Sequence, residues 1–101
     1  FEPHRYSRVI SLKNDFSKCF KKSNLVIMCP LYAAGEKKNT KFDTVKFANL
    51  IAKNSKTQVI IIRNQIELNK YLKKNLINNE IIIGMGAGSI SKWMHDLKDL
   101  L

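Results

Sequence analysis

The sequence predicts an α/β fold with a narrow, mostly parallel open sheet and flanking helices. Three short, mostly apolar runs, at 25–29, 59–62 and 80–83, are typical of strands covered on both faces. Segments with helical spacing of apolar residues separate these runs. The alternation of helix and strand is the pattern of right-handed crossovers that feed a parallel sheet. With 101 residues, the chain is expected to form one small domain with a modest core.

The first half of the chain predicts a loop, a helix, a strand and a second helix. Residues 1–8 begin as a loop, because Pro3 keeps the residue before it out of helical geometry. A helix over 10–20 follows, with Ser11 or Asn14 as its cap. Asp43 is expected to cap the second helix. The expected inner faces of the two helices are Ile10, Leu12, Phe16, Cys19 and Phe20, then Val45, Phe47, Ala48, Leu50, Ile51 and Ala52.

The second half predicts two more strands and two more helices. Strands are expected at Val59–Ile62 and Glu80–Ile83, with a helix from Gln65 to Leu76 between them. A last helix is expected from Ile90 to Leu101. The apolar faces of these two helices would be Ile66, Leu68, Leu72 and Leu76, then Trp93, Met94, Leu97 and Leu100.

The formal charge of +10 raises the question of nucleic-acid binding. The lysines are interleaved with the apolar positions of the expected helices, as on solvated helix faces, and no basic stripe with interleaved aromatic residues accompanies them. The distribution of charge therefore argues against a specific nucleic-acid partner and leaves weak, salt-sensitive binding of polyanions open.

Cysteine spacing and hydropathy place the chain among soluble cytoplasmic domains. Cys19 and Cys29 have no CxxC spacing, so two buried thiols are expected rather than a disulfide or a metal pair. The chain has no apolar stretch near the roughly 18 residues that a membrane span requires, and no signal peptide. We therefore expect no membrane partner and a cytoplasmic location.

The opening octapeptide, Phe-Glu-Pro-His-Arg-Tyr-Ser-Arg, has the composition of an anion-binding segment. Arg5 and Arg8 each carry a planar fork of donors that suits carboxylate or phosphate groups. His4 lies beside them and is a candidate for orienting a substrate, with a solvated loop histidine as the alternative. The alternative for the whole segment is a frayed basic terminus.

Two further segments directly follow expected strands. The first contains Tyr32, Gly35 and Glu36, and the second runs Gly-Met-Gly-Ala-Gly-Ser from position 84. Ligands of open α/β sheets bind outside the carboxyl ends of the strands, where both segments are expected. Gly86, Ala87 and Gly88 could let the backbone approach an anion at the start of the last helix, although a tight turn without ligand stays an alternative. Ser89 stands where a dinucleotide-binding loop has its third glycine, which disfavours NAD.

In that order, the three segments resemble the C-terminal domain of the Mur ligases. The octapeptide matches their Phe-x-Pro-His-Arg-Tyr-(Ser/Thr)-Arg motif, and the later segments match Tyr-x-Ala-Gly-Glu and Gly-Ala-Gly-(Asp/Asn)-Ile. The resemblance covers nearly the whole chain. Within the family, the motifs most closely resemble those of the branch that adds L-alanine to UDP-N-acetylmuramate. It implies a Rossmann-like domain in peptidoglycan synthesis, preceded by one more strand that residues upstream of Phe1 would supply.

The resemblance also implies roles for residues. Arg5 and Arg8 would supply charge to the reaction, and His4 would contact substrate. The other candidate substrate-binding residues are Tyr32, Gly35, Glu36, Gly86, Ala87 and Gly88. Glu36 would pair with Arg5, with Arg8 or with the substrate ammonium group. Ser89 replaces the usual Asp or Asn and would keep only a capping role, while His95 is expected at the surface.

The sequence contains no Gly-x-x-Gly-Lys-(Ser/Thr) phosphate loop and no carboxylate pair suited to magnesium. The resemblance implies that ATP and Mg²⁺ bind mainly to a central domain outside this chain, and that the isolated chain is inactive with no cofactor of its own. Its partners would then be UDP-N-acetylmuramate, L-alanine and the enzyme's other domains. A stand-alone nucleotide- or phosphate-binding module and a basic polyanion-binding domain are the alternative interpretations.

Overall fold

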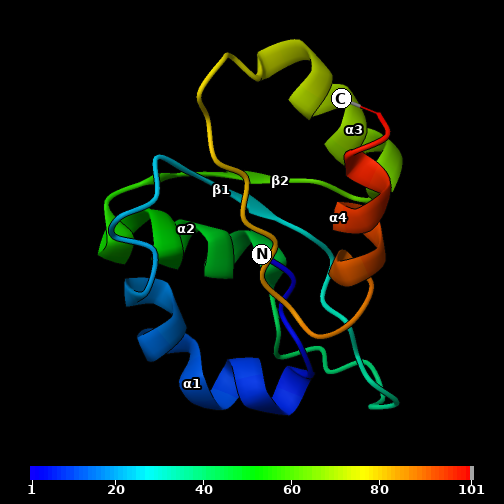
Figure 1. Ribbon diagram of the computed structural model, residues 1–101. Helices are drawn as coiled ribbons and strands as arrows, with labels where there is room; N and C mark the ends of the chain where they lie inside the picture. Colours follow the sequence, from blue (N-terminus) through cyan, green and yellow to red (C-terminus); the bar gives the residue numbers. More distant parts are fainter. Residues whose placement is uncertain (101) are drawn as a thin grey trace.

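Two parallel strands form the centre of the fold. In the computed structural model, which describes residues 1–100, β1 (Leu25–Met28) pairs with β2 (Gln58–Ile61) from Leu25 opposite Gln58 to Met28 opposite Ile61. Helix α2 (Thr44–Ser55) forms the crossover between them (Figure 1). The predicted α/β class with a narrow parallel sheet is therefore confirmed.

Helices cover both faces of the sheet. Helices α1 (Tyr6–Lys18) and α2 lie on one side, and α3 (Gln65–Asn75) and α4 (Ile90–Leu97) lie on the other (Figure 1). Each face of the sheet has its own hydrophobic cluster, because successive side chains of β1 point to opposite faces: Val26 and Met28 belong to the cluster on the α1–α2 side, whereas Ile27 packs against the cluster on the α3–α4 side. The buried residues on the α1–α2 side are Val9, Phe20, Val26, Met28, Phe47, Ala48 and Ile51. Those on the α3–α4 side are Cys29, Ile62, Leu68, Leu72, Ile90 and Leu97.

Residues Phe1–Arg5, which we call the N-terminal arm, extend the pairing of the sheet beside β1. The amine of Phe1 donates to the carbonyl of Ile27 at 2.8 Å, and Cys29 N–H donates to the carbonyl of Phe1 at 2.8 Å. Further along, His4 forms a parallel bridge with Tyr32. The chain thus begins outside any helix, as Pro3 predicted, but the arm pairs with the sheet where a loop was expected.

Helix α1 begins earlier than the sequence predicted. It starts at Tyr6, inside the octapeptide, and ends at Lys18, so the predicted caps Ser11 and Asn14 are wrong. The start is fixed by tertiary contacts, because Arg5 N–H is held by the carbonyl of Tyr32 while the Arg5 carbonyl accepts from Val9 N–H. The predicted cap of α2 is confirmed, since Asp43 accepts from Lys46 N–H at 3.1 Å.

Several residues of the expected inner faces are exposed. Leu12, Val45 and Ile66 lie at the surface, because the two-stranded sheet is too narrow to cover the full apolar stripe of each helix. Cys19, expected to be buried, is an exposed free thiol just beyond α1, whereas Cys29 is a buried free thiol as predicted.

The predicted third strand at Glu80–Ile83 is not formed. Residues 80–83 belong to no helix or strand, and Ile81 and Ile83 are 88% and 72% exposed. A strand needs a hydrogen-bonded neighbour, and the nearest main-chain bond joins Glu2 N–H to the Met85 carbonyl at 2.8 Å. This segment therefore has the composition of a strand without the partner that would make it one.

The last helix is shorter than predicted. Helix α4 ends at Leu97, and the expected continuation to Leu101 reaches a residue outside the described part of the chain. Within residues 1–100, no helix combines the length and apolar character needed to cross a membrane.

A buried hydroxyl ties α1 to α2. Ser55 donates its Oγ proton to the carbonyl of Ser17 and accepts from Phe20 N–H at 3.2 Å. Ser55→Ala should lower the free energy of unfolding by about 1–3 kcal/mol, because it leaves both main-chain groups buried without a partner. Thermal denaturation measures the loss. Exposed Ser91 is the matched control, and equal melting temperatures for Ser55→Ala and Ser91→Ala would contradict this role.

Candidate functional site

The N-terminal arm and the segment after β1 are held together at the carboxyl end of the sheet. Tyr32 N–H donates to the carbonyl of Pro3, and Arg5 N–H donates to the carbonyl of Tyr32, each at 2.8 Å. The rings of His4 and Tyr32 stack with centroids 5.5 Å apart and an interplanar angle of 11°. The structure thus brings together two of the three predicted segments.

His4 has an unused polar atom. Its ring is half-buried against Tyr32, and its Nδ1 is buried without a hydrogen-bond partner among the described residues. Buried polar atoms in proteins are nearly always paired, so this unpaired atom lowers the stability of the fold. The half-buried, stacked ring argues against a freely solvated histidine, and the substrate contact of His4 stays a prediction.

Arg5 has an unfavourable backbone conformation. Its φ of 63° and ψ of 130° lie in a region that residues with a Cβ rarely adopt, and the bonds of its N–H and carbonyl groups hold it there. Arg5 and Arg8 are both exposed, at the residue before α1 and in its first turn. Neither arginine takes part in the ion pairs of residues 1–100, so both guanidinium groups are available.

Of the partners expected for Glu36, neither Arg5 nor Arg8 forms an ion pair with it, and the substrate ammonium group stays a prediction. The Glu36 carboxylate instead accepts two hydrogen bonds from Ser7, from the N–H at 3.2 Å and from the hydroxyl. These bonds, more than the nearby charge of Arg5, hold the pKa of Glu36 below its ordinary range. Gly35 precedes it with φ of 88°, a conformation that favours glycine and turns the chain back toward α1.

Residues 84–89, which we call the glycine segment, pack against the N-terminal arm, Tyr32 and α4. A Cβ on Gly88 would lie 2.5 Å from Cγ of Tyr32, and one on Gly86 would lie 2.7 Å from Cγ2 of Ile90. The glycines therefore permit close approach of the segment to the arm and to α4. Ser89 precedes α4 but makes no side-chain capping bond, so its predicted cap is wrong. Ala87 is exposed, as is His95.

Glu2 is a site residue that the sequence analysis missed. It is only 3% exposed, and its Oε1 accepts from Gly88 N–H at 3.0 Å. The amide that could have bound a phosphate at the start of α4 thus faces a carboxylate of the chain itself. The feature of the sequence that could have indicated this role is that Glu2 is the acidic residue of an otherwise basic octapeptide, at the variable position of the motif.

Residues 1–100 contain no group of three or more His, Cys, Asp and Glu side chains placed to hold a metal ion. Arg5 and Arg8 carry the positive charges of this site, and two carboxylates lie near them, Glu2 bonded to Gly88 N–H and Glu36 bonded to Ser7. The guanidinium groups form no ion pair among the described residues and suit an anionic ligand, whereas residues 1–100 offer no set of oxygen ligands for Mg²⁺.

Comparison with known proteins gives relatives along the full chain. A protein of Pelagibacter ubique is 46% identical over 101 residues, which is all of this chain and 22% of that protein. Relatives from Prochlorococcus marinus and Bartonella bacilliformis are 34% and 31% identical over 98% and 95% of the chain, which span 21% and 20% of those proteins. No family model matches the chain. The chain thus spans about a fifth of the length of these relatives.

The α/β fold, the three clustered motifs and these matches define the class: the chain belongs to the Mur ligase family, with the features of its C-terminal domain. Each of the three relatives is named UDP-N-acetylmuramate–L-alanine ligase. The resemblance read from the motifs, including its closest branch, is confirmed.

The strain at Arg5 predicts an unusual response to glycine. Arg5→Gly should be more stable than Arg5→Ala by about 1 kcal/mol or more, because glycine adopts this backbone conformation without steric cost. The same pair at Arg8, in the first turn of α1, should show the reverse order, with glycine less stable by about 0.5–1 kcal/mol. Chemical denaturation of the four variants gives both differences. A more stable alanine at both positions would refute the strain.

The bond between Glu2 and Gly88 can be tested at one amide. Glu2→Leu should lower stability by about 1–3 kcal/mol and expose the Gly88 N–H to hydrogen exchange, because within residues 1–100 it removes the acceptor of that group. Glu2→Gln keeps an oxygen at Oε1 and should preserve the protection. Amide exchange followed by NMR measures this directly, and unchanged protection of Gly88 in Glu2→Leu would show that the bond is unimportant.

Proposed function

We propose that this domain positions substrate in an ATP-dependent ligase that joins L-alanine to UDP-N-acetylmuramate in peptidoglycan synthesis. The observation that carries the proposal is the match of the whole chain, at 46% identity, to part of a protein of that name. The clustering of the arm, Tyr32 and the glycine segment at one edge of the sheet supports it.

In the proposed reaction, ATP phosphorylates the lactyl carboxylate of UDP-N-acetylmuramate, and the amine of L-alanine attacks the acyl phosphate to form an amide. Negative charge develops on the tetrahedral oxyanion and on the departing phosphate. Arg5 and Arg8 would stabilise this charge with planar, permanently charged donors that form no ion pair with a carboxylate of the described residues. His4 would contact the substrate beside Tyr32, on which its ring stacks.

We assign ATP and magnesium to the part of the longer enzyme outside this chain. The chain offers the metal no cluster of ligands within residues 1–100, and Glu2 occupies the Gly88 amide. A carboxylate at that amide repels phosphate, which also disfavours the alternative of a stand-alone phosphate-binding module. The enzyme's other domains would be the partners of this one, with Tyr32, Gly35, Glu36, Gly86, Ala87 and Gly88 shaping the substrate surface.

A chimera tests this proposal. The chain replaces the matching segment of the Pelagibacter ubique relative, and ligation of L-alanine to UDP-N-acetylmuramate is measured with and without substitutions. Arg5→Ala and Arg8→Ala should each lower kcat by about a hundredfold or more, because one positioned donor to developing charge is worth about 3 kcal/mol.

Lys53→Ala is the matched control for these arginines. Lys53 lies in the last turn of α2, which leads into the start of β2 and therefore lies at the opposite edge of the sheet. This variant should keep the activity of the chimera, and the isolated chain should have none. An inactive chimera with folded domains, or full activity in both arginine variants, would contradict the proposed role.

A further inference from the structure

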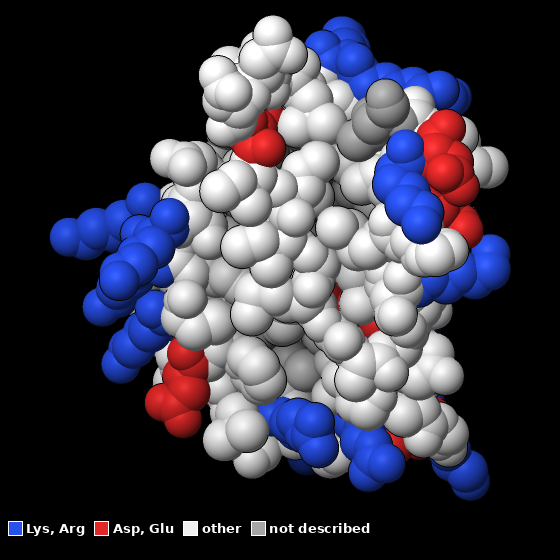
Figure 2. All heavy atoms as spheres, viewed as in Figure 1, with Lys and Arg blue, Asp and Glu red and all other residues white. Residues whose placement is uncertain are grey.

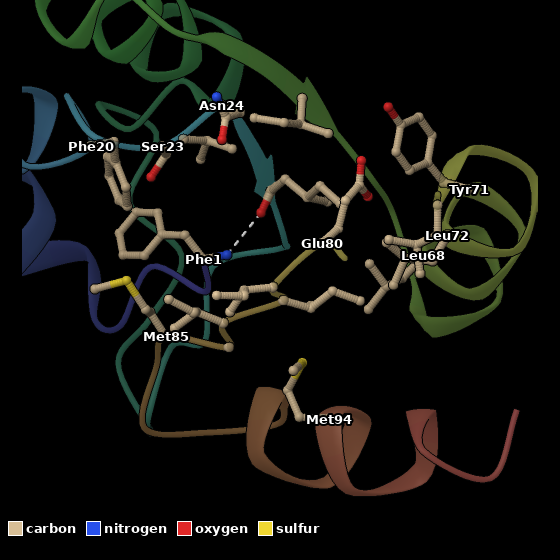
Figure 3. A pocket seen from close by; sticks show the side chains of 18 of the residues that line it. Phe1, Phe20, Ser23, Asn24, Leu68, Tyr71, Leu72, Glu80, Met85 and Met94 are labelled. Atoms are coloured by element: carbon tan, nitrogen blue, oxygen red, sulfur yellow. Dashed lines mark hydrogen bonds between the residues drawn. The ribbon is translucent and has the colours of Figure 1, made fainter. Parts of the chain in front are cut away.

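The turn that carries Arg5 and Arg8 lies at an open surface. The pocket between β1 and residues 80–83, with a volume of about 660 Å³, has a largely apolar lining that includes neither arginine (Figure 3). Figure 2 shows lysine and arginine side chains at the edges of the displayed face, whose middle is mostly uncharged. Because both guanidinium groups are exposed and form no ion pair among residues 1–100, the backbone that carries them has to set their position.

Helix α1 has no cap of the usual kind. The residue before a helix commonly accepts a hydrogen bond from the first turn through a side-chain oxygen, but arginine has no acceptor, and Arg5 makes no such bond. The first turn of α1 contains no acidic residue. The amides at the start of the helix therefore need an acceptor from elsewhere in the chain.

Glu36 supplies this acceptor across 29 residues of sequence. Its Oε1 accepts from Ser7 N–H at 3.2 Å, and its Oε2 accepts from the Ser7 hydroxyl. Ser7 is the second residue of α1, so its amide is one that a cap commonly serves, and the helix dipole also favours a carboxylate there. The Ser7 hydroxyl, and then the Ser7 N–H, hold the pKa of Glu36 below its ordinary range, as expected for a carboxylate that is bonded in its ionised form.

The turn before Glu36 has the conformation that brings this carboxylate to α1. Ala34 and Gly35 both lie in the left-handed region, with φ of 53° and 88°, and Glu36 N–H donates to the Ala33 carbonyl at 3.1 Å. A Cβ on Gly35 would meet no atom within 4 Å, so this glycine serves the backbone conformation and not close packing. The chain thus accepts an uncommon conformation at Ala34, a residue with a Cβ, in the turn that leads to Glu36.

The segment after β1 holds the turn with both arginines at two points. The Tyr32 carbonyl accepts from Arg5 N–H at 2.8 Å, and the Glu36 carboxylate binds Ser7 two residues further on. Arg8 follows Ser7 directly in the first turn of α1. A shift of Ser7 would therefore change the position of Arg8 relative to Arg5.

We infer that Glu36 is a positioning residue, which caps α1 through Ser7 and so fixes the two arginines relative to each other. The inference rests on the proposed function, which gives the arginines a reaction to serve. In this role both oxygens of the carboxylate are bonded to Ser7 and neither touches substrate. The competing role is the expected contact of Glu36 with the substrate ammonium group.

Kinetics of the chimera separate the two roles. Glu36→Ala should lower kcat about tenfold or more and change KM for L-alanine less than about threefold, because displaced arginines cost rate rather than binding of the amino acid. Ser7→Ala should lower kcat by a smaller factor, and the double variant should lose less than the product of the two losses, since both changes remove the same contact. Ser7→Thr keeps the hydroxyl and should keep kcat.

Hydrogen exchange of the isolated chain gives a second measure that does not depend on activity. The Ser7 amide should exchange about tenfold faster or more in Glu36→Ala, because its acceptor is removed. Glu67→Ala is the matched control. Glu67 likewise accepts from a main-chain N–H and a side chain, both of Arg63, but it lies in α3 on the other face of the sheet (Figure 1). This variant should leave both kcat and the exchange of the Ser7 amide unchanged.

A rise of about tenfold or more in KM for L-alanine, with kcat unchanged in Glu36→Ala, would assign Glu36 to the substrate and overturn the inference. Unchanged exchange of the Ser7 amide in Glu36→Ala would also overturn it, as would an unchanged kcat in an active chimera. An inactive chimera with folded domains is a different result: it would overturn the proposed function, and this inference with it.

Discussion

The pairing of the N-terminal arm with β1 is the interaction on which the candidate site depends. It puts the Phe1 ring into the core beneath α1 and α2 and directs Glu2 to the glycine segment on the other side. It also brings His4 against Tyr32 and fixes the residue at which α1 begins. Each of these contacts joins parts of the chain that are far apart in sequence, so loss of the arm would separate all three motifs at once.

The charges of the site come from two arginines and two carboxylates. Glu2 bonds Gly88 N–H and Glu36 bonds Ser7, so neither carboxylate forms an ion pair with Arg5 or Arg8, although the charge of Arg5 still acts on Glu36. The two guanidinium groups are therefore left facing solvent at the start of α1. The overall charge of +10 says little about this edge, since lysines elsewhere lie along helix surfaces.

His4 and Arg5 are neighbours in the chain. The unpaired Nδ1 of His4 and the backbone conformation of Arg5 each lower the stability of this small domain. They occur where main-chain bonds to Tyr32 hold the backbone rigidly. Such rigidity would favour the proposed binding of one substrate by these residues, because mobile groups would have to be ordered when the ligand binds.

The sequence by itself determined the fold class, the helices with strong apolar spacing, the Asp43 cap and the family, because these depend on local periodicity and on short motifs. Tertiary structure decided the rest. Whether 80–83 becomes a strand depends on a neighbour, and whether Val45 or Ile66 is buried depends on the width of the sheet. The partners of Glu2 and Glu36 were likewise fixed by long-range contacts, across 86 and 29 residues, which no local pattern records.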